Sequence, residues 1–515
     1  MVKTTNFYSA SIAEAIFEPL LKYDYLARPL QLVPNTVESL PKVEQDGKVY
    51  IFKIKPGIYF TNDPAFKGKR RELVAEDYVY TIKRILDPKN RAPSVSFIDG
   101  KLQGADAVVA QAKKTGKFDY AAPIAGLKAI DRYTLQFTLT RQDFNFPYIL
   151  AYITFGAVAK EVVDYYGDRI GMHPVGTGPY MLSKYVPRSK VELVANPDYR
   201  GFVWNFKSTG TPWDNQLVKE MYGKKMPQVG KVVVSIIEEE QSRWLAFQSG
   251  QLDFDKLTAN AVPQALDGNQ LKASFKKRGI KHYPNKDPEI TYTMMNMRDP
   301  VIGGFSPEKI ALRRAITLSY NQKESIQQAY KSQAVRAQMF IPEGVNGYDP
   351  KYRSSVGYNP LLANKLLDYY GYKKAADGYR TLPNGKPLIL KINTENSSAS
   401  VIHSELWKKN LDAIGIRADF KVSNFADNLK AATQCKYMIW SGAWIADYPE
   451  GDNFAQLLYG PNAGQGNHAC YQSKTYDALY TQAIHLPPQQ RLPYYEKLNR
   501  QIEADNPWII QIGRA

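Results

Sequence analysis

Segments with strand-like and helix-like patterns alternate along almost the whole chain of 515 residues. Residues 49–54 and 134–139 alternate apolar and polar side chains, as strands with one buried face do, whereas residues 74–86 have helical spacing. A β-branched run at 231–237 stands next to a helical segment at 239–249. No proline-rich or serine-rich tether interrupts this mixture. We therefore expect an α/β protein whose domains share chain crossovers, as lobes around a hinge do.

The length of the chain exceeds what one hydrophobic core supports, so size alone predicts two or three domains. The formal net charge of +17 would ordinarily suggest nucleic acid or an anionic membrane as a partner. Only residues 67–71 (KGKRR) form a dense basic cluster, and the other cations are scattered among acids. Because no recognised nucleic-acid-binding module supports the charge, we expect no nucleic-acid partner.

Cys435 and Cys470 are the only cysteines, which excludes a disulfide-stapled scaffold and any CxxC zinc or redox site. Two alternatives stay open, one disulfide in an oxidising compartment or two buried thiols, because the spacing does not decide between them. No stretch reaches the roughly 18 apolar residues of a membrane span. The first ten residues lack the apolar core of a signal peptide, so we expect either an internal protein or a leader missing from this sequence.

Enzyme signatures are missing from the sequence. It has no GxSxG, HExxH or Walker A pattern. The glycine-rich turn at 175–180 lacks the third glycine and the following helix of a dinucleotide fingerprint. We therefore expect no catalysis and no cofactor. We also expect no metal site, because the histidines show no close ligand spacing. The histidines are His173, His282, His403, His468 and His485.

The most informative stretch is 437–454, YMIWSGAWIADYPEGDNF. Its first four residues favour a buried strand, which we expect to end at Ser441 and Gly442. Asp447 follows in an apolar context, where a buried carboxylate needs a cation or several donors. It would bind a ligand ammonium if a cleft opens there, or else cap the next turn. We reject the idea that Asp447 and Glu450 are a pair of glycosidase carboxylates, because the two residues lie in one turn and such carboxylates must face each other across a substrate.

A series of segments, taken in order, resembles the extracytoplasmic solute-binding proteins of the peptide/nickel/oligopeptide family, which serve ABC importers. No single segment is decisive, but their ordered succession across nearly the whole chain is specific. The matching segments are IFEPLLKYD (16–24), DGKVYIFKIKPGIYF (46–60), LVAEDYVYTIKRILDP (73–88), GLKAIDRYTLQFTL (126–139), VGTGPYMLSKYV (175–186), VELVANPDYRG (191–201), FQSGQLD (247–253), MNMRDP with ALRRAI (295–316), NPLLANKLLDYYGY (359–372) and AWIADYPEGDNF (443–454).

The resemblance implies a two-lobed periplasmic-binding-protein-like α/β fold (class II or cluster C), with an additional domain inserted in one lobe. Lobe I would comprise residues 1–22, 171–285 and 490–515, the additional domain 23–170, and lobe II 286–489. The ligand would be enclosed between the lobes by hinge closure, and the closed form would deliver it to the membrane permease.

The resemblance also implies site residues. Peptide-binding members use the aspartate of an ADY-like motif to hold the α-ammonium of the peptide, and Asp447 occupies that position with Trp444 and Tyr448 beside it. Asn260 is a weaker candidate, in the loop after SGQLD. We therefore expect a monomeric substrate-binding component of an ABC importer that captures oligopeptides or dipeptides. An oligosaccharide or a nickel complex as the solute is the alternative, and a hydrolase is the remote one.

This chain departs from the family at both ends. Relatives begin with a strand and a loop before the IFEPLL-like helix, and they continue past PWIIQI (507–512). Without those segments lobe I would lack an edge strand and its closing strands. We therefore expect a truncated sequence or segments that it does not represent. The location implied by the family is periplasmic or extracytoplasmic, with a lipid anchor at the outer face of the inner membrane as one option.

Overall fold

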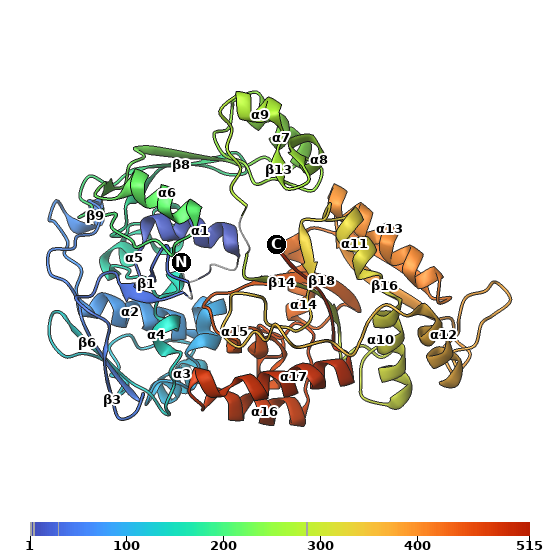
Figure 1. Ribbon diagram of the computed structural model, residues 1–515. Coiled ribbons are helices and arrows are strands. Elements are labelled where there is room, and N and C mark those ends of the chain that lie inside the picture. Colours follow the sequence, from blue (N-terminus) through green and yellow to red (C-terminus); the bar gives the residue numbers. More distant parts are fainter. Residues whose placement is uncertain (1–2, 4–5, 29, 285–286, 515) are drawn as a thin grey trace. The chain divides into compact units, whose positions relative to one another are not determined.

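The computed structural model describes residues 3, 6–28, 30–284 and 287–514 (Figure 1). The chain divides into two compact units, Met1–Ile236 and Ile237–Ala515. Each unit has its own sheets and helices, so the mixed α/β composition expected from the sequence is confirmed in both.

The first unit contains a four-stranded antiparallel sheet of order β3-β4-β6-β5 and a three-stranded one of order β11-β8-β7. Helix α2 packs on the four-stranded sheet through β5 and β6. The helices are α1 (Phe7–Ile16), α2 (Ala75–Leu86), α3 (Ala105–Thr115), α4 (Phe146–Ile149), α5 (Lys160–Tyr166) and α6 (Pro212–Met221). The strands are β1 (Leu21–Tyr23), β2 (Leu32–Pro34), β3 (Lys42–Glu44), β4 (Val49–Lys53), β5 (Leu127–Ala129), β6 (Thr134–Thr138), β7 (Tyr180–Val186), β8 (Lys190–Ala195), β9 (Phe202–Val203), β10 (Lys225–Met226) and β11 (Lys231–Ser235).

The spacing of Ile12, Ile16 and Leu20 predicts an amphipathic helix over residues 12–25, and the structure shows that these bounds are wrong. Helix α1 begins at Phe7, where the side chain of Asn6 accepts from the backbone N–H of Ser9 at 3.0 Å, and it ends at Ile16, because Phe17 is already extended. Proline at position 19 has no N–H to donate and biases the residue before it away from the helical conformation, so the chain leaves the helix there. It continues as strand β1, which pairs with β2.

The glycine-rich turn at 175–180 packs against the end of α1. A Cβ atom on Gly176 would lie 2.0 Å from the carbonyl oxygen of Ile16, and the N–H of Gly178 donates to that same oxygen at 2.8 Å. Only glycine permits this approach of two backbones. The turn therefore has a packing role, and β7 follows it instead of the helix that a dinucleotide site requires.

The second unit is built on a six-stranded mixed sheet of order β15-β19-β14-β18-β16-β17. Its helices are α7 (Glu240–Gln248), α8 (Val262–Ala265), α9 (Ala273–Lys277), α10 (Pro307–Ser319), α11 (Gln322–Gln328), α12 (Pro360–Tyr369), α13 (Ser398–Asp412), α14 (Phe425–Thr433), α15 (Asp452–Ala455), α16 (Lys474–Ile484) and α17 (Leu492–Asp505). Its strands are β12 (Leu266–Asp267), β13 (Gln270–Leu271), β14 (Glu289–Met295), β15 (Ala334–Arg336), β16 (Ile389–Glu395), β17 (Arg417–Ser423), β18 (Ile439–Ile445) and β19 (Trp508–Arg514).

Two apolar cores cover the two faces of the six-stranded sheet. On one face Tyr292 and Trp440 pack with buried residues of α15, α16 and α17. On the other face Met295 and Ile439 pack with buried residues of α10, α12 and α13. Neighbouring residues of one strand thus enter opposite cores, which is the period-two pattern of a strand buried on both sides. The sheet is a rigid support for the loops at its edges.

One part of the expected lobe assignment differs from the structure. Residues 490–515 were expected with 171–285, but β19 pairs with β14 and β15 in the sheet of the second unit. Hydrogen bonds across a sheet depend on the tertiary fold, which sequence periodicity does not encode. The other lobe boundaries stay predictions, and the one between 285 and 286 lies outside the described residues.

Candidate functional site

Strand β18 is longer than expected and carries the chain to the candidate aspartate. The break expected at Ser441 and Gly442 is wrong, because the strand pairs with β14 without interruption from Ile439 to Ile445. The hydroxyl groups of Ser441 and Thr293 lie 2.7 Å apart and form a hydrogen bond across the two strands. This pairing satisfies the polar residue inside the sheet. Asp447 therefore follows the carboxyl end of a central strand by two residues.

Asn453 fixes the position of Asp447. Its amide Nδ2 donates to Asp447 Oδ2 at 3.0 Å, and its Oδ1 accepts from the backbone N–H of Asp447 at 3.0 Å. The same Oδ1 accepts from the indole Nε1 of Trp444, also at 3.0 Å. Asn453 is fully buried, whereas Asp447 and Trp444 are partly exposed. One buried amide thus orients both of the first two candidate residues.

A buried ion pair between Glu450 and Arg491 holds the loop that carries Asp447. The carboxylate of Glu450 accepts from Arg491 Nη1 at 2.9 Å and from the hydroxyl of Tyr495 at 2.7 Å. The two charged side chains are 2% and 0% exposed. Burial opposes the positive charge of Arg491, but the carboxylates of Glu450 and Asp452 outweigh it and raise the pKa of Arg491. Glu450 is therefore held by partners from the region of α17, and it serves the shape of the loop.

Tyr448 and Asn260 belong to different surroundings. Tyr448 is buried, and its hydroxyl donates to Asp452 Oδ2 at 3.0 Å, so it packs inside the loop that carries Asp447. The carbonyl of Asn260 accepts from Gln264 at 3.3 Å, beside the small apolar core of Trp244. The structure therefore groups Asp447 with Trp444 around one amide, while a ligand role for Tyr448 or Asn260 stays a prediction.

Three supporting residues were missed by the sequence reasoning. Asn453 lies inside the stretch that was singled out, and its signal was an amide six residues after the aspartate. Arg491 and Tyr495 come from the far end of the chain and gave no local signal. Only the fold brings these two residues into hydrogen-bonding contact with Glu450.

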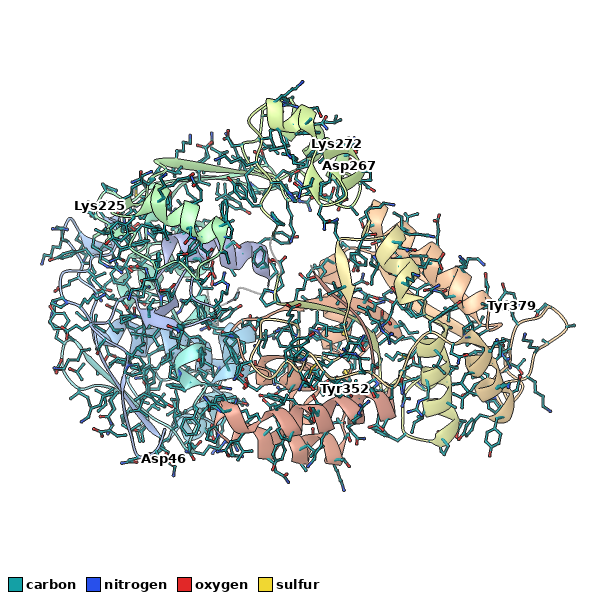
Figure 2. The ribbon with its side chains drawn as sticks, viewed as in Figure 1. Asp46, Lys225, Asp267, Lys272, Tyr352 and Tyr379 are labelled. Carbon is teal, nitrogen blue, oxygen red and sulfur yellow. A yellow bond between two sulfur atoms is a disulfide. The ribbon has the colours of Figure 1, made fainter. Side chains whose placement is uncertain are left out.

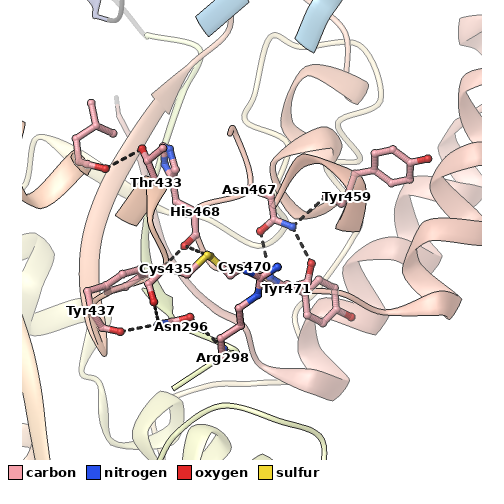
Figure 3. Close-up of a disulfide and its surroundings, with 11 residues drawn as sticks. Asn296, Arg298, Thr433, Cys435, Tyr437, Tyr459, Asn467, His468, Cys470 and Tyr471 are labelled. Atoms are coloured by element: carbon pink, nitrogen blue, oxygen red, sulfur yellow. Dashed lines mark hydrogen bonds between the residues drawn. A yellow bond between two sulfur atoms is a disulfide. The ribbon is translucent and has the colours of Figure 1, made fainter. Parts of the chain in front are cut away.

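A disulfide anchors the start of the same strand (Figure 3). Cys435 and Cys470 are bonded, with Cα atoms 6.1 Å apart, which decides between the two alternatives that spacing left open. Asn296 Nδ2 donates to the carbonyls of Cys435 and Tyr437 at 2.9 and 2.7 Å. The hydroxyl of Tyr437 donates to the carbonyl of His468 at 2.8 Å. The segment before β18 is thereby tied to β14 and to residues 467–471.

Neither a membrane span nor a metal cluster occurs in the described part of the chain. Within residues 3, 6–28, 30–284 and 287–514, the helices fall short of the length and apolar character that crossing a bilayer requires. The same residues contain no group of three or more His, Cys, Asp or Glu side chains arranged to hold a metal ion.

The sequence profile of the bacterial extracellular solute-binding proteins, family 5, matches residues 31–466. The chain belongs to this family. Family 5 membership covers the loop that carries Asp447, and it confirms the resemblance on which the two-lobed α/β fold was expected.

Relatives of this family 5 protein are distant in sequence but similar over most of their length. Heme-binding protein A of Haemophilus influenzae is 23% identical over 509 residues, with 98% of this chain and 82% of the relative covered. Di/tripeptide-binding protein 1 of Pseudomonas aeruginosa is 24% identical over 490 residues, with 93% and 78% covered.

A solved structure confirms the fold class of this family 5 protein. The periplasmic binding protein DppA from Helicobacter pylori, solved in complex with the peptide STSA, superposes with a TM-score of 0.75 at 21% identity. The superposition covers 99% of this chain and 89% of that one. The fold is therefore that of the two-lobed periplasmic binding proteins.

Proposed function

We propose that this family 5 protein binds short peptides and that Asp447 holds the peptide α-ammonium. The observation that carries the proposal is the partly exposed carboxylate of Asp447 at the end of β18, oriented by the buried amide of Asn453. A carboxylate whose position is already fixed loses little side-chain entropy when it accepts from a ligand ammonium. Support also comes from the relative named as a di/tripeptide-binding protein and from the neighbour that holds a peptide.

The indole of Trp444 would form an apolar wall beside this carboxylate. Its Nε1 is engaged by Asn453, so the ring is held in one orientation and a partly exposed portion remains for a ligand. A cation beside an aromatic face and a carboxylate gains from both. The chain would then fix one end of the peptide and grip the rest through backbone hydrogen bonds, which do not depend on side-chain identity.

Calorimetry with a panel of short peptides tests this proposal. A charge-assisted hydrogen bond is worth about 1.5 to 3 kcal/mol, so both N-acetylation of the peptide and Asp447→Asn should weaken binding by about 10- to 150-fold. The two changes should not add, because each removes the same contact. Asp419→Asn is the matched control, since Asp419 is exposed on β17 of the same sheet. Equal affinity for free and acetylated peptides would remove the ammonium role.

The proposal also covers how the protein takes part in transport, where it works and whether it is a monomer. We infer that the protein works outside the cytoplasm and hands its peptide to an ABC permease. The family is extracellular, and the disulfide suits an oxidising compartment.

Peptides recovered intact by mass spectrometry after prolonged incubation would agree with binding without turnover. A single species of one-chain mass in light scattering would agree with a monomer, and a smaller radius of gyration with peptide would agree with hinge closure.

A further inference from the structure

Helix α12 exposes large apolar side chains on the face that it turns away from the core. Ala363 and Leu367 are buried. Leu361 and Tyr369 are 77% and 83% exposed. A spacing of eight residues puts these two side chains on the same side of the helix, about 12 Å apart along its axis. Both side chains therefore present most of their apolar surface to solvent.

The hairpin-like segment that follows, residues 373–388, lies against the end of this helix. A Cβ atom on Gly371 would come within 3.8 Å of Pro383 Cβ, which places one turn of the segment beside the last turn of α12. In Figure 1 the segment projects outward next to α12, and Tyr379 marks it in Figure 2. The segment therefore lies beside the last turn of α12.

Positive charge is concentrated in this part of the second unit. Residues 237–515 contain 34 Lys and Arg against 27 Asp and Glu, a net charge of +7, and residues 351–391 contain eight against two, a net charge of +6. Both acids are already engaged, because Asp368 pairs with Arg380 at 2.6 Å and Asp377 pairs with Arg417. Six exposed lysines of residues 351–391 form no ion pair with any carboxylate that the structure describes, and four of them belong to α12 or to the segment that follows it: Lys365, Lys373, Lys374 and Lys386.

We propose that these residues form a docking surface for an anionic phospholipid membrane. The surface, called the α12 patch, consists of Leu361, Lys365, Tyr369, Lys373, Lys374 and Lys386. Leucine and tyrosine side chains enter the boundary between headgroups and acyl chains, while lysines reach the phosphates from the same depth through their flexible stems. A surface that carries cations and no unpaired acid matches the uniform negative charge of such a membrane.

An acidic protein is the other class of partner for a basic surface. It would be recognised through matched ion pairs, and it gives no reason for leucine and tyrosine side chains that are more than three-quarters exposed. The apolar residues among the lysines therefore favour the membrane. This inference does not depend on peptide binding, since none of the patch residues belongs to the Asp447 site.

Co-sedimentation of the full chain with lipid vesicles tests the proposal. We expect binding to phosphatidylcholine vesicles that contain phosphatidylglycerol, little binding to pure phosphatidylcholine, and loss of binding at high salt. Each lysine near the surface contributes about a five-fold gain, so the variant K365E/K373E/K374E/K386E should lose at least roughly 100-fold in partitioning. The variant L361S/Y369S keeps the charge and should still weaken binding several-fold.

A matched control separates the patch from net charge. The variant K113E/K114E/K276E/K277E makes the same change of charge at exposed lysines elsewhere and should keep most of the binding. Equal losses in the two quadruple variants, or no binding to anionic vesicles, would overturn the proposal. Equal binding of soluble polyglutamate by the wild type and by L361S/Y369S, with no gain on vesicles, would assign the patch to an acidic protein instead. Retained peptide affinity and circular dichroism show that each variant is folded.

Discussion

Replacing Glu450 by glutamine should destabilise the second unit by several kcal/mol. The carboxylate accepts from Arg491 at 2.9 Å, from Tyr495 at 2.7 Å and from the backbone N–H of Asp452 at 3.0 Å. Glutamine has no charge and offers one oxygen, so the fully buried guanidinium would keep chiefly its bonds to the carbonyls of Leu486 and Ile484. Removing one partner of a buried pair typically costs about 3 to 5 kcal/mol.

Urea denaturation followed by tryptophan fluorescence measures this loss, with the transition of the second unit fitted separately if the two units unfold apart. The double variant E450Q/R491M removes both charges of the pair, and it should recover part of the stability, because the guanidinium is no longer left without Glu450 and only Asp452, which accepts from the hydroxyl of Tyr448, loses a nearby cation. Lys408→Gln is the control, since it breaks the exposed pair with Asp412 and should cost no more than about 1 kcal/mol. A loss below about 1 kcal/mol for E450Q, or a double variant as unstable as the sum of the single ones, would refute the reasoning.

Three further predictions concern the supports of the fold. Reducing the bond between Cys435 and Cys470, which are 35 positions apart, should lower the free energy of unfolding by roughly 4 kcal/mol, as melting with and without a reductant would show. Burial lowers the pKa of His468 to about 4, below its value in the unfolded chain. The unfolded state therefore binds the proton first, so stability should fall by up to about 1.4 kcal/mol per pH unit as the pH drops from 6.5 to 4, and His468→Gln should flatten this slope. Gly176→Ala should cost about 1 to 3 kcal/mol or more in denaturation experiments, because the added Cβ would meet the carbonyl of Ile16; an unchanged midpoint would contradict this packing role.

Sequence periodicity predicted the elements of the second unit well where one pattern ran without conflict. The Ser-Pro-Glu start at 306–308 predicts a helix over 306–319, which is observed as α10, and the composition of residues 290–297 (ITYTMMNM) predicts a buried strand, which is observed as β14. The prediction from periodicity was wrong where local sequence signals competed with strand pairing in the tertiary structure. Ser441 and Gly442 are weak strand formers, yet β14 holds them in the sheet.

The candidate site shows the same division. The local sequence pointed to Asp447 and Trp444, because a carboxylate surrounded by apolar side chains needs a hydrogen-bonding or charged partner in any fold. Which group holds the neighbouring carboxylate of Glu450 was not readable from the sequence, since Arg491 lies 41 positions away in the chain. The α12 patch was likewise overlooked, because the exposure of Leu361 and Tyr369 depends on which face of α12 the core covers.

The sequence by itself determined the α/β class and the family, and it pointed to Asp447 as the candidate, since these depend on side-chain periodicity and on motifs that are local in the chain. The tertiary structure alone decided the disulfide, the buried Glu450 and Arg491 pair and the membership of β19 in the sheet of the second unit. These depend on distances between residues far apart in the chain, and such distances are set by how the two cores pack around one sheet.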